Sequence, residues 1–131
     1  MEILNNVVIL IEESIGIHNF ESGGILGGKG EIVTNYVFDR VCLKNEYIPD
    51  VISLNDIIIE WGKCDIAFLG LIHSHETNNN LSYSDIQYAV NIVTHNKLEY
   101  IYMLVYVINK KNIYAYKVGG NFINKENINY V

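Results

Sequence analysis

Apolar residues near the start of the chain recur at a helical spacing. They fall at positions i, i+3, i+4, i+7 and i+11: Leu4, Val7, Val8, Ile11 and Ile15. This spacing puts them on one side of a helix, so it predicts an amphipathic helix over residues 4–17. The stretch from position 7 to position 11 is rich in β-branched residues, which also suit strands, so a strand is the alternative for this segment.

The next segments predict a β-hairpin. Residues 21–30 read ESGGILGGKG, a short apolar stretch enclosed by glycines. After it, β-branched and aromatic side chains occupy alternate positions, which is typical of a strand: Ile32, Thr34, Tyr36 and Phe38. Together the two stretches predict a pair of strands that turn near Gly28–Gly30.

Two more helices follow in the pattern. The first begins after Asp50, an N-cap candidate, and carries an apolar stripe made of Val51, Leu54, Ile58 and Trp61. The second follows a polar break at residues 81–85. Its buried face is predicted to contain Ile86, Ala89, Val90 and Val93. Ser84 and Gln87 have the spacing of a capping box at its start.

Three apolar segments in the second half predict strands. Residues 66–72 form a continuous apolar run of strand length, which fits a central strand buried on both faces. Residues 100–108 and 112–118 predict two strands around a turn at residues 109–111.

The order of these elements predicts an α/β domain in which helices flank a mixed β-sheet, in two or three layers. A chain of 131 residues fits one domain, residues 1–131. We predict no element for the tail, residues 119–131.

Charge and composition exclude several classes of protein. Half of the residues are hydrophobic and 18% are charged, a balance typical of a folded chain. The net charge is −6 and the nine Lys and Arg residues are scattered, so we expect no nucleic acid as partner. No apolar run reaches the roughly 18 residues of a membrane span, and the start of the chain lacks a positively charged leader. We therefore expect a cytoplasmic protein with no membrane partner.

The two cysteines, Cys42 and Cys64, form no CxxC pair. This spacing excludes a zinc ribbon and a dithiol redox site. In a cytosolic protein we expect two reduced, mostly buried thiols, with a single disulfide as the alternative.

The stretch HSHETNNNLSYSD, residues 73–85, carries the candidate chemistry. His73 and His75 end the predicted central strand, and side chains two apart on a strand point to the same side. Asp85 falls in the first turn of the next helix, where the helix dipole favours an ionised carboxylate. Only nine residues separate His75 from Asp85, so the three side chains are able to converge on one metal ion.

This donor set predicts zinc. Two imidazoles favour zinc over magnesium, although nickel, iron or copper also bind such donors. Three protein ligands leave the fourth tetrahedral position for water, which is the pattern of a catalytic site. We expect one zinc per chain, which lowers the pKa of its water to about 7.

Two other residues are candidates for catalysis. Glu21, at the start of ESGGILGG, can act as a general base that moves a proton from water to the leaving amine. The glycines after it permit a close approach of the backbone. Ser82 can donate a hydrogen bond to an oxyanion. Singly, such residues are commonly surface carboxylates or helix caps, and it is their combination that indicates a hydrolase.

In this order the motifs resemble the JAMM metalloproteases, also called MPN-plus or JAB domains. The resemblance rests on ESGGILGG, HSH and a later Ser-x-x-Asp, and covers residues 4–118. It implies a compact JAB/MPN domain related to the cytidine deaminase fold. It also implies the roles of the site residues, with zinc ligands at His73, His75 and Asp85, the catalytic glutamate at Glu21 and the oxyanion serine at Ser82.

The resemblance implies a reaction and a partner. The family hydrolyses isopeptide or peptide bonds after the C-terminal Gly of ubiquitin or ubiquitin-like proteins, for deconjugation or for maturation. The expected partner is therefore a ubiquitin-like protein or its conjugates, with activating and conjugating enzymes of the same operon as further candidates. The compact ESGGILGG segment resembles the prokaryotic branch.

Two departures from the family pattern concern the loop after the histidines. Glu76 stands where the family usually has Pro, and residues 76–81, which separate His75 from Ser82, are one fewer than usual. We keep Ser82 in its role, with a shortened loop. Glu76 is able to compete for the metal or to repel an acidic substrate.

Three other functions compete with that of a zinc isopeptidase. A catalytically silent MPN-type scaffold is favoured by the short loop, but all five site positions are filled. A zinc deaminase requires a CxxC that the chain lacks. A dinuclear phosphoesterase requires more ligands, and only His18 and His95 remain. For substrate binding, the candidates are a hairpin edge at residues 31–38, which can pair with an extended tail, and the loop at residues 78–81.

Overall fold

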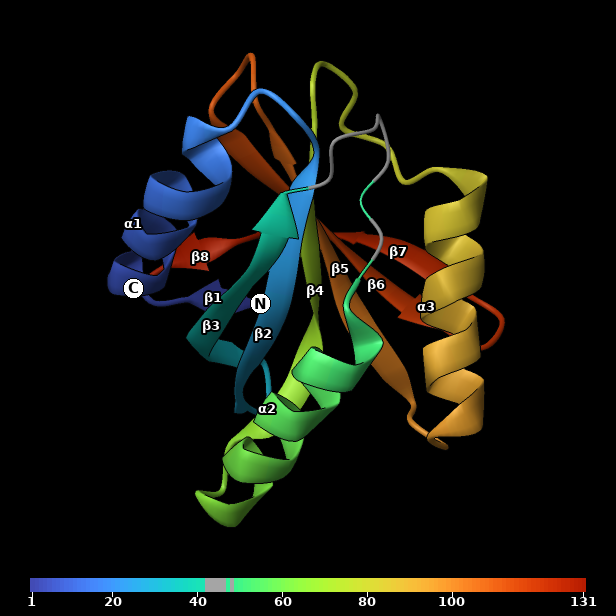
Figure 1. The fold of residues 1–131 in the computed structure, drawn as a ribbon. Coiled ribbons are helices and arrows are strands. Elements are labelled where there is room, and N and C mark those ends of the chain that lie inside the picture. Colours follow the sequence, from blue (N-terminus) through green and yellow to red (C-terminus); the bar gives the residue numbers. More distant parts are fainter. Residues whose placement is uncertain (42–46, 48) are drawn as a thin grey trace.

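The centre of the molecule is a single curled sheet. The computed structural model describes residues 1–41, 47 and 49–131, and within them it places eight strands in that sheet (Figure 1). The strands are β1 (Glu2–Ile3), β2 (Ser22–Lys29), β3 (Ile32–Val41), β4 (Ala67–His75), β5 (Tyr100–Val107), β6 (Asn112–Gly119), β7 (Ile123–Glu126) and β8 (Asn129–Tyr130).

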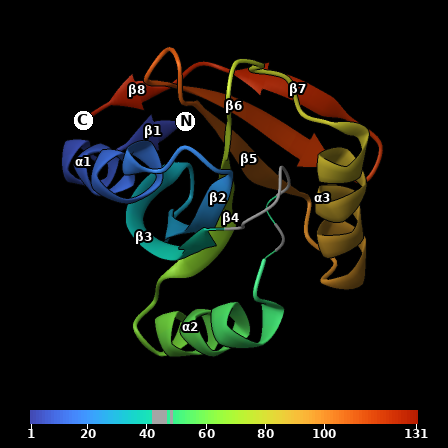
Figure 2. The ribbon, with the colours of Figure 1, turned by 45° about the horizontal axis from the view of Figure 1, so that its top comes forward.

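The strands follow the spatial order β7-β6-β5-β4-β2-β3-β1-β8. β4 and β5 are parallel, β1 is parallel to both β3 and β8, and the other pairs are antiparallel. The sheet curls around α1 (Figure 2). Across this curl, Lys117 of β6 forms an ion pair of 3.2 Å with Glu31, in the turn between β2 and β3, although these segments are not neighbours in the sheet.

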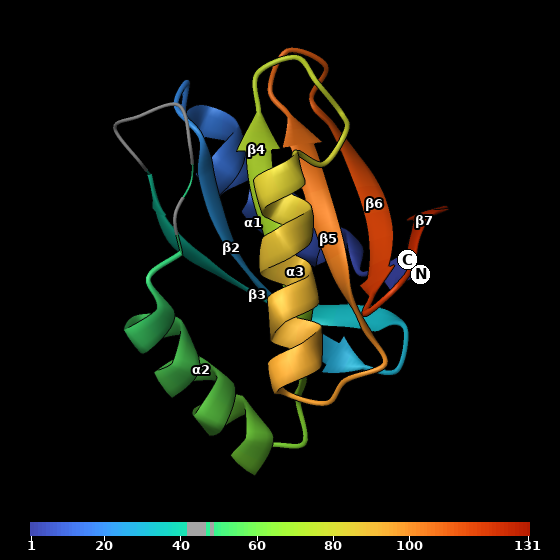
Figure 3. The ribbon, with the colours of Figure 1, turned by 90° about the vertical axis from the view of Figure 1, so that its right-hand side faces the viewer.

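Helices cover both faces of the sheet. On one face lies α1 (Asn5–Ser14), extended by the 3-10 turn η1 (Ile15–Ile17), and on the other lie α2 (Val51–Lys63) and α3 (Tyr83–His95) (Figure 3). The result is a compact α/β domain with a mixed sheet between helices, which confirms the predicted fold class.

Strand β5 shows why some apolar runs are continuous. Tyr102 and Leu104 belong to the core on the α1 side, whereas Met103 and Val105 belong to the core beneath α2 and α3. All four side chains are buried, because helices cover both faces of the sheet at this strand. A strand with two buried faces has no position that favours a polar residue.

The predicted elements are present, with small changes at their ends. The segment 4–17 is helical, the hairpin turns at Gly30 with a positive φ of 57°, and Asp50 caps α2 by accepting a hydrogen bond from the Ser53 amide. The strand predicted at 66–72 continues to His75, because β5 pairs with it as far as that residue, while β2 pairs with it as far as His73.

The sequence pattern did not identify the strands at the two chain ends. The tail left without an element forms the last residue of β6, then β7 and β8. β8 pairs in parallel with β1, so Asn129 and Tyr130 lie beside Glu2 and Ile3. The edge proposed at residues 31–38 is also partly wrong, since β1 pairs with β3 at Ile32 and Val33.

Two other expectations concern the cysteines and membrane-spanning segments. Cys64 is a free thiol but is exposed, so its predicted burial is wrong, and Cys42 lies outside the described residues. None of the helices in the described part of the chain is long and apolar enough to cross a membrane.

Candidate metal centre

The end of β4 holds the two histidines on one face of the sheet. His73 pairs with Gly23 of β2 and with Val105 of β5, and His75 pairs with Val107. Strands flank His73 on both sides, whereas at His75 the backbone is paired with β5 alone. Both side chains point to the same side, as the two-residue spacing predicts.

The third candidate ligand, the carboxylate of Asp85, lies in the first turn of α3. Ser82 is the N-cap, and its hydroxyl accepts a hydrogen bond from the Asp85 amide at 3.1 Å. In return, Asp85 Oδ2 accepts from the Ser82 amide at 2.9 Å, which completes a capping box. The capping box predicted for Ser84 and Gln87 is therefore wrong, because the helix begins earlier, at Tyr83.

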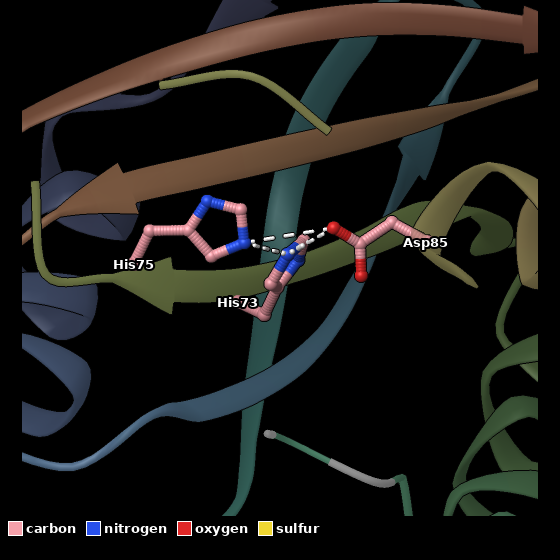
Figure 4. Close-up of side chains that lie close together, drawn as sticks. All are labelled: His73, His75 and Asp85. Carbon is pink, nitrogen blue, oxygen red and sulfur yellow. Dashed lines mark hydrogen bonds and ion pairs between the residues drawn. The ribbon is translucent and has the colours of Figure 1, made fainter. Parts of the chain in front are cut away.

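The three side chains converge on one point (Figure 4). His73 Nε2 lies 3.0 Å from His75 Nε2 and 3.1 Å from Asp85 Oδ2, and His75 Nε2 lies 3.5 Å from the same oxygen. Ligands bound tetrahedrally to zinc at about 2.0–2.1 Å are about 3.3 Å apart. The triangle therefore has the size that one zinc ion requires.

The protonation states also suit a metal. His75 Nδ1 lies 3.0 Å from the Asn78 carbonyl, which can only accept, so a neutral ring carries its proton there and leaves the Nε2 lone pair toward the cluster. Burial alone would raise the pKa of Asp85, but its interactions with the two adjacent imidazoles outweigh burial and hold that pKa well below its usual range. Asp85 is therefore an ionised ligand candidate.

The shortened loop after β4 is anchored at several points. Tyr116 of β6 donates its hydroxyl to the Asn79 carbonyl at 2.6 Å, next to the carbonyl that binds His75. The Asn109 amide donates to the Glu76 carbonyl at 3.1 Å. The Glu76 side chain is exposed and is not part of the His73, His75 and Asp85 group.

Glu21 lies beside the three candidate ligands, immediately before β2. It lines the same cavity, of about 230 Å³, whose walls are Glu21, Tyr47, His73, His75, Ser82, Ser84 and Asp85. Its Oε2 accepts a hydrogen bond from the Tyr47 amide at 3.0 Å. Burial raises the pKa of Glu21, despite this hydrogen bond and the nearby imidazoles, which lower it. A raised pKa suits a carboxylate that must take up and release a proton.

Gly23 shows why the segment ESGGILGG needs glycine close to the site. A Cβ atom on Gly23 would lie 2.5 Å from the Tyr47 ring and 2.6 Å from the Ile72 carbonyl oxygen. The absence of a side chain therefore lets Tyr47 lie against β2 and form one wall of the cavity. An adjoining, largely apolar pocket shares Tyr47, His73 and Asp85 with this cavity and also contains Pro49, Leu71 and Met103.

The structure thus brings all five predicted site residues to one cavity, while their roles stay predictions. Ser82 Oγ lies there 3.2 Å from Ser84 Oγ. The other two histidines are elsewhere, with His18 stacked on Phe38 and His95 bonded to the Asn91 carbonyl. Sequence reasoning missed Tyr47, because no motif marks it.

Comparison with known proteins adds the fold family. No family model matches the chain, and no curated protein is significantly similar to it in sequence. Among solved structures, the protein DSY2949 from Desulfitobacterium hafniense is 16% identical with a TM-score of 0.72, covering 100% of this chain and 93% of that one. AF2198 from Archaeoglobus fulgidus, a JAB1/MPN domain protein, is 16% identical with a TM-score of 0.60, covering 100% and 99%.

The chain has the JAB/MPN fold. A structure described as a JAMM metalloprotease-like zinc site in the proteasome and signalosome agrees, at 15% identity, a TM-score of 0.58 and coverage of 100% and 97%. The fold implied by the resemblance is confirmed. At these identities, the assignment of any activity to this JAB/MPN domain depends on its own residues.

Proposed function

We propose that this JAB/MPN domain is a zinc-dependent isopeptidase or peptidase that cleaves after the C-terminal Gly of a ubiquitin-like protein. The observation that carries the proposal is the convergence of His73, His75 and Asp85, with Glu21 in the same cavity. Three neutral or anionic donors around one point, beside a separate carboxylate, are the parts of a metallohydrolase rather than of a binding surface.

The chemistry divides between the metal and the chain. Zinc held by the three side chains would lower the pKa of a water molecule to about 7 and polarise the scissile carbonyl. Glu21, fixed by the Tyr47 amide, takes a proton and passes it to the leaving amine. Ser82, at the rim of the cavity, donates to the oxyanion that develops on the substrate.

The walls of the cavity favour a substrate that has no side chain on the residue whose carbonyl is cleaved. Tyr47 lies against Gly23 on one side, and the start of α3 with Ser82 and Ser84 forms another wall. A bulky residue at the junction would meet these walls, and such a clash can outweigh several favourable contacts. This is why we expect Gly at the end of the partner, and ubiquitin-like proteins have such ends.

The cleavage itself is the direct test. Ubiquitin and related ubiquitin-like proteins carrying a C-terminal peptide extension are incubated with the zinc-loaded protein and analysed by mass spectrometry. We expect a free carboxylate directly after the terminal Gly of one partner. Replacing that Gly with Val should slow cleavage by at least about 100-fold, the effect of losing about 3 kcal/mol of transition-state stabilisation.

Two results would contradict the proposal. Equal cleavage of the Gly and Val junctions would indicate a general peptidase. No cleavage of any fusion, with zinc present at full occupancy, would indicate the silent MPN-type scaffold.

A separate prediction concerns the loop that supports His75. Tyr116→Phe removes the hydrogen bond to the Asn79 carbonyl but keeps the buried ring. The loop that orients His75 then becomes looser, and loss of such an outer contact typically weakens metal binding by about 10- to 100-fold. Competition with a chromophoric chelator measures the zinc affinity.

Tyr114→Phe is the matched control, because Tyr114 lies on the same strand and its ring faces Lys125. We expect its zinc affinity to equal that of the unmodified protein. An unchanged affinity in Tyr116→Phe would show that the Tyr116 hydroxyl does not support the metal site.

A further inference from the structure

A buried hydroxyl links the metal centre to the strand that carries Glu21. Ser74 lies between the two histidines on β4, is fully buried, and faces away from the metal cavity. Its Oγ accepts a hydrogen bond from the Ser22 amide at 3.0 Å and lies 3.5 Å from the Ser22 carbonyl, to which it can donate. These residues are 52 positions apart in the chain.

The link lies where the backbone pairing of the two strands stops. The ladder between β2 and β4 ends at the pair Gly23 and His73. One residue further along, the Ser74 side chain binds both backbone polar groups of Ser22 in place of a partner strand. The Ser22 amide belongs to the peptide bond that joins it to Glu21, so this hydroxyl fixes the direction in which the chain passes from Glu21 into β2.

We propose that Ser74 is a positioning residue that holds the Glu21 carboxylate beside the metal ligands. This inference rests on the proposed function, since it assigns Glu21 the task of moving a proton. His73 and His75 place the ligands on one face of β4, and Ser74 on the opposite face ties the same strand to the base. The triplet HSH would therefore hold both the candidate metal ligands and the segment that carries Glu21.

The Ser74 hydroxyl supplies the acceptor for a buried amide. Ser74→Ala leaves the buried Ser22 amide without its acceptor, and an unsatisfied buried amide weakens its segment. Ser74→Thr keeps an oxygen at the same position and suits a strand. Ser22→Ala is the matched control, because within the described residues Ser22 Oγ is buried without a hydrogen-bond partner. It removes a hydroxyl of equal size from the neighbouring strand and leaves the link in place.

The first arm of the experiment needs no substrate. Amide hydrogen exchange is followed by NMR for the zinc-loaded protein and the three variants. In Ser74→Ala the amide of residue 22 should exchange about tenfold faster, as expected for the loss of one hydrogen bond. Ser74→Thr and Ser22→Ala should stay close to the unmodified protein. Unchanged exchange in Ser74→Ala would overturn the proposal.

The second arm tests the consequence for catalysis with the Gly-junction fusion. In Ser74→Ala we expect kcat to fall by about 10- to 100-fold, because a carboxylate displaced by about 1 Å loses its alignment. KM and zinc content should stay the same, and Ser74→Thr should recover kcat. Faster exchange together with an unchanged kcat would overturn the positioning role.

The two proposals fail separately. If the unmodified protein cleaves no fusion, the proposed function fails, and the exchange arm still decides whether Ser74 holds the peptide before Ser22. If the unmodified protein is active and Ser74→Ala loses zinc, Ser74 supports the metal ligands rather than Glu21, and the proposal is wrong while the function stands.

Discussion

Replacing His75 with Ala is expected to release the metal and abolish hydrolysis. We expect about one zinc ion per chain in protein purified without chelator, and nearly none in His75→Ala after gel filtration. The imidazole supplies one corner of the ligand triangle, with its Nε2 3.0 Å from that of His73. Its side chain is only 13% exposed, so nothing from solvent reproduces the second imidazole in that geometry.

Elemental analysis of the two proteins measures this effect, and the fusion assay follows the activity. His95→Ala is the matched control, since His95 lies at the end of α3, is exposed and bonds only the Asn91 carbonyl in the described contacts. It should retain full zinc and full activity. Equal zinc in His75→Ala and the unmodified protein would remove the metal assignment.

Periodicity identified the elements that bury side chains. The patterns of α1, of the long hairpin, and of β4 and β5 each extend over many residues. A single residue that departs from such a pattern therefore does not hide it. β1 and β8 contain two residues each and pair across the two ends of the chain. No local pattern can mark such strands, because only the position of the partner defines them.

The start of α3 shows a different limit. Ser82 and Ser84 are both followed three residues later by a polar side chain that can close a capping box, Asp85 or Gln87. Local sequence does not choose between them. The choice follows from the site, since Asp85 is drawn toward the two histidines and its amide and carboxylate both bind Ser82.

The candidate ligands were predictable because each has a local cause. His73 and His75 share a strand face, and Asp85 occupies the first turn of a helix nearby. Tyr47 was not predictable, since its contacts with Glu21 and Gly23 join segments distant in sequence. The same holds for Ser74, whose role depends on how β2 and β4 align.

Glu21→Gln is expected to keep the zinc and nearly abolish hydrolysis. The carboxylate is not among the three side chains that form the ligand triangle, so the metal should stay at about one ion per chain. A glutamine has nearly the same size and can still accept the hydrogen bond from the Tyr47 amide, which is 3.0 Å from Oε2. It cannot take up a proton at neutral pH. Loss of a general base typically lowers kcat by about 10²- to 10⁴-fold, with little effect on KM.

Zinc content, melting temperature and kcat on the Gly-junction fusion are measured together for Glu21→Gln, Glu21→Ala and Glu76→Gln. The last variant removes a nearby carboxylate that is exposed and lies outside the ligand group, so it should retain both zinc and kcat. Loss of zinc in both Glu21 variants would make Glu21 a ligand instead of the base. Retention of kcat in Glu21→Gln would show that another group moves the proton, and Glu21 would then serve only to bind the segment at Tyr47.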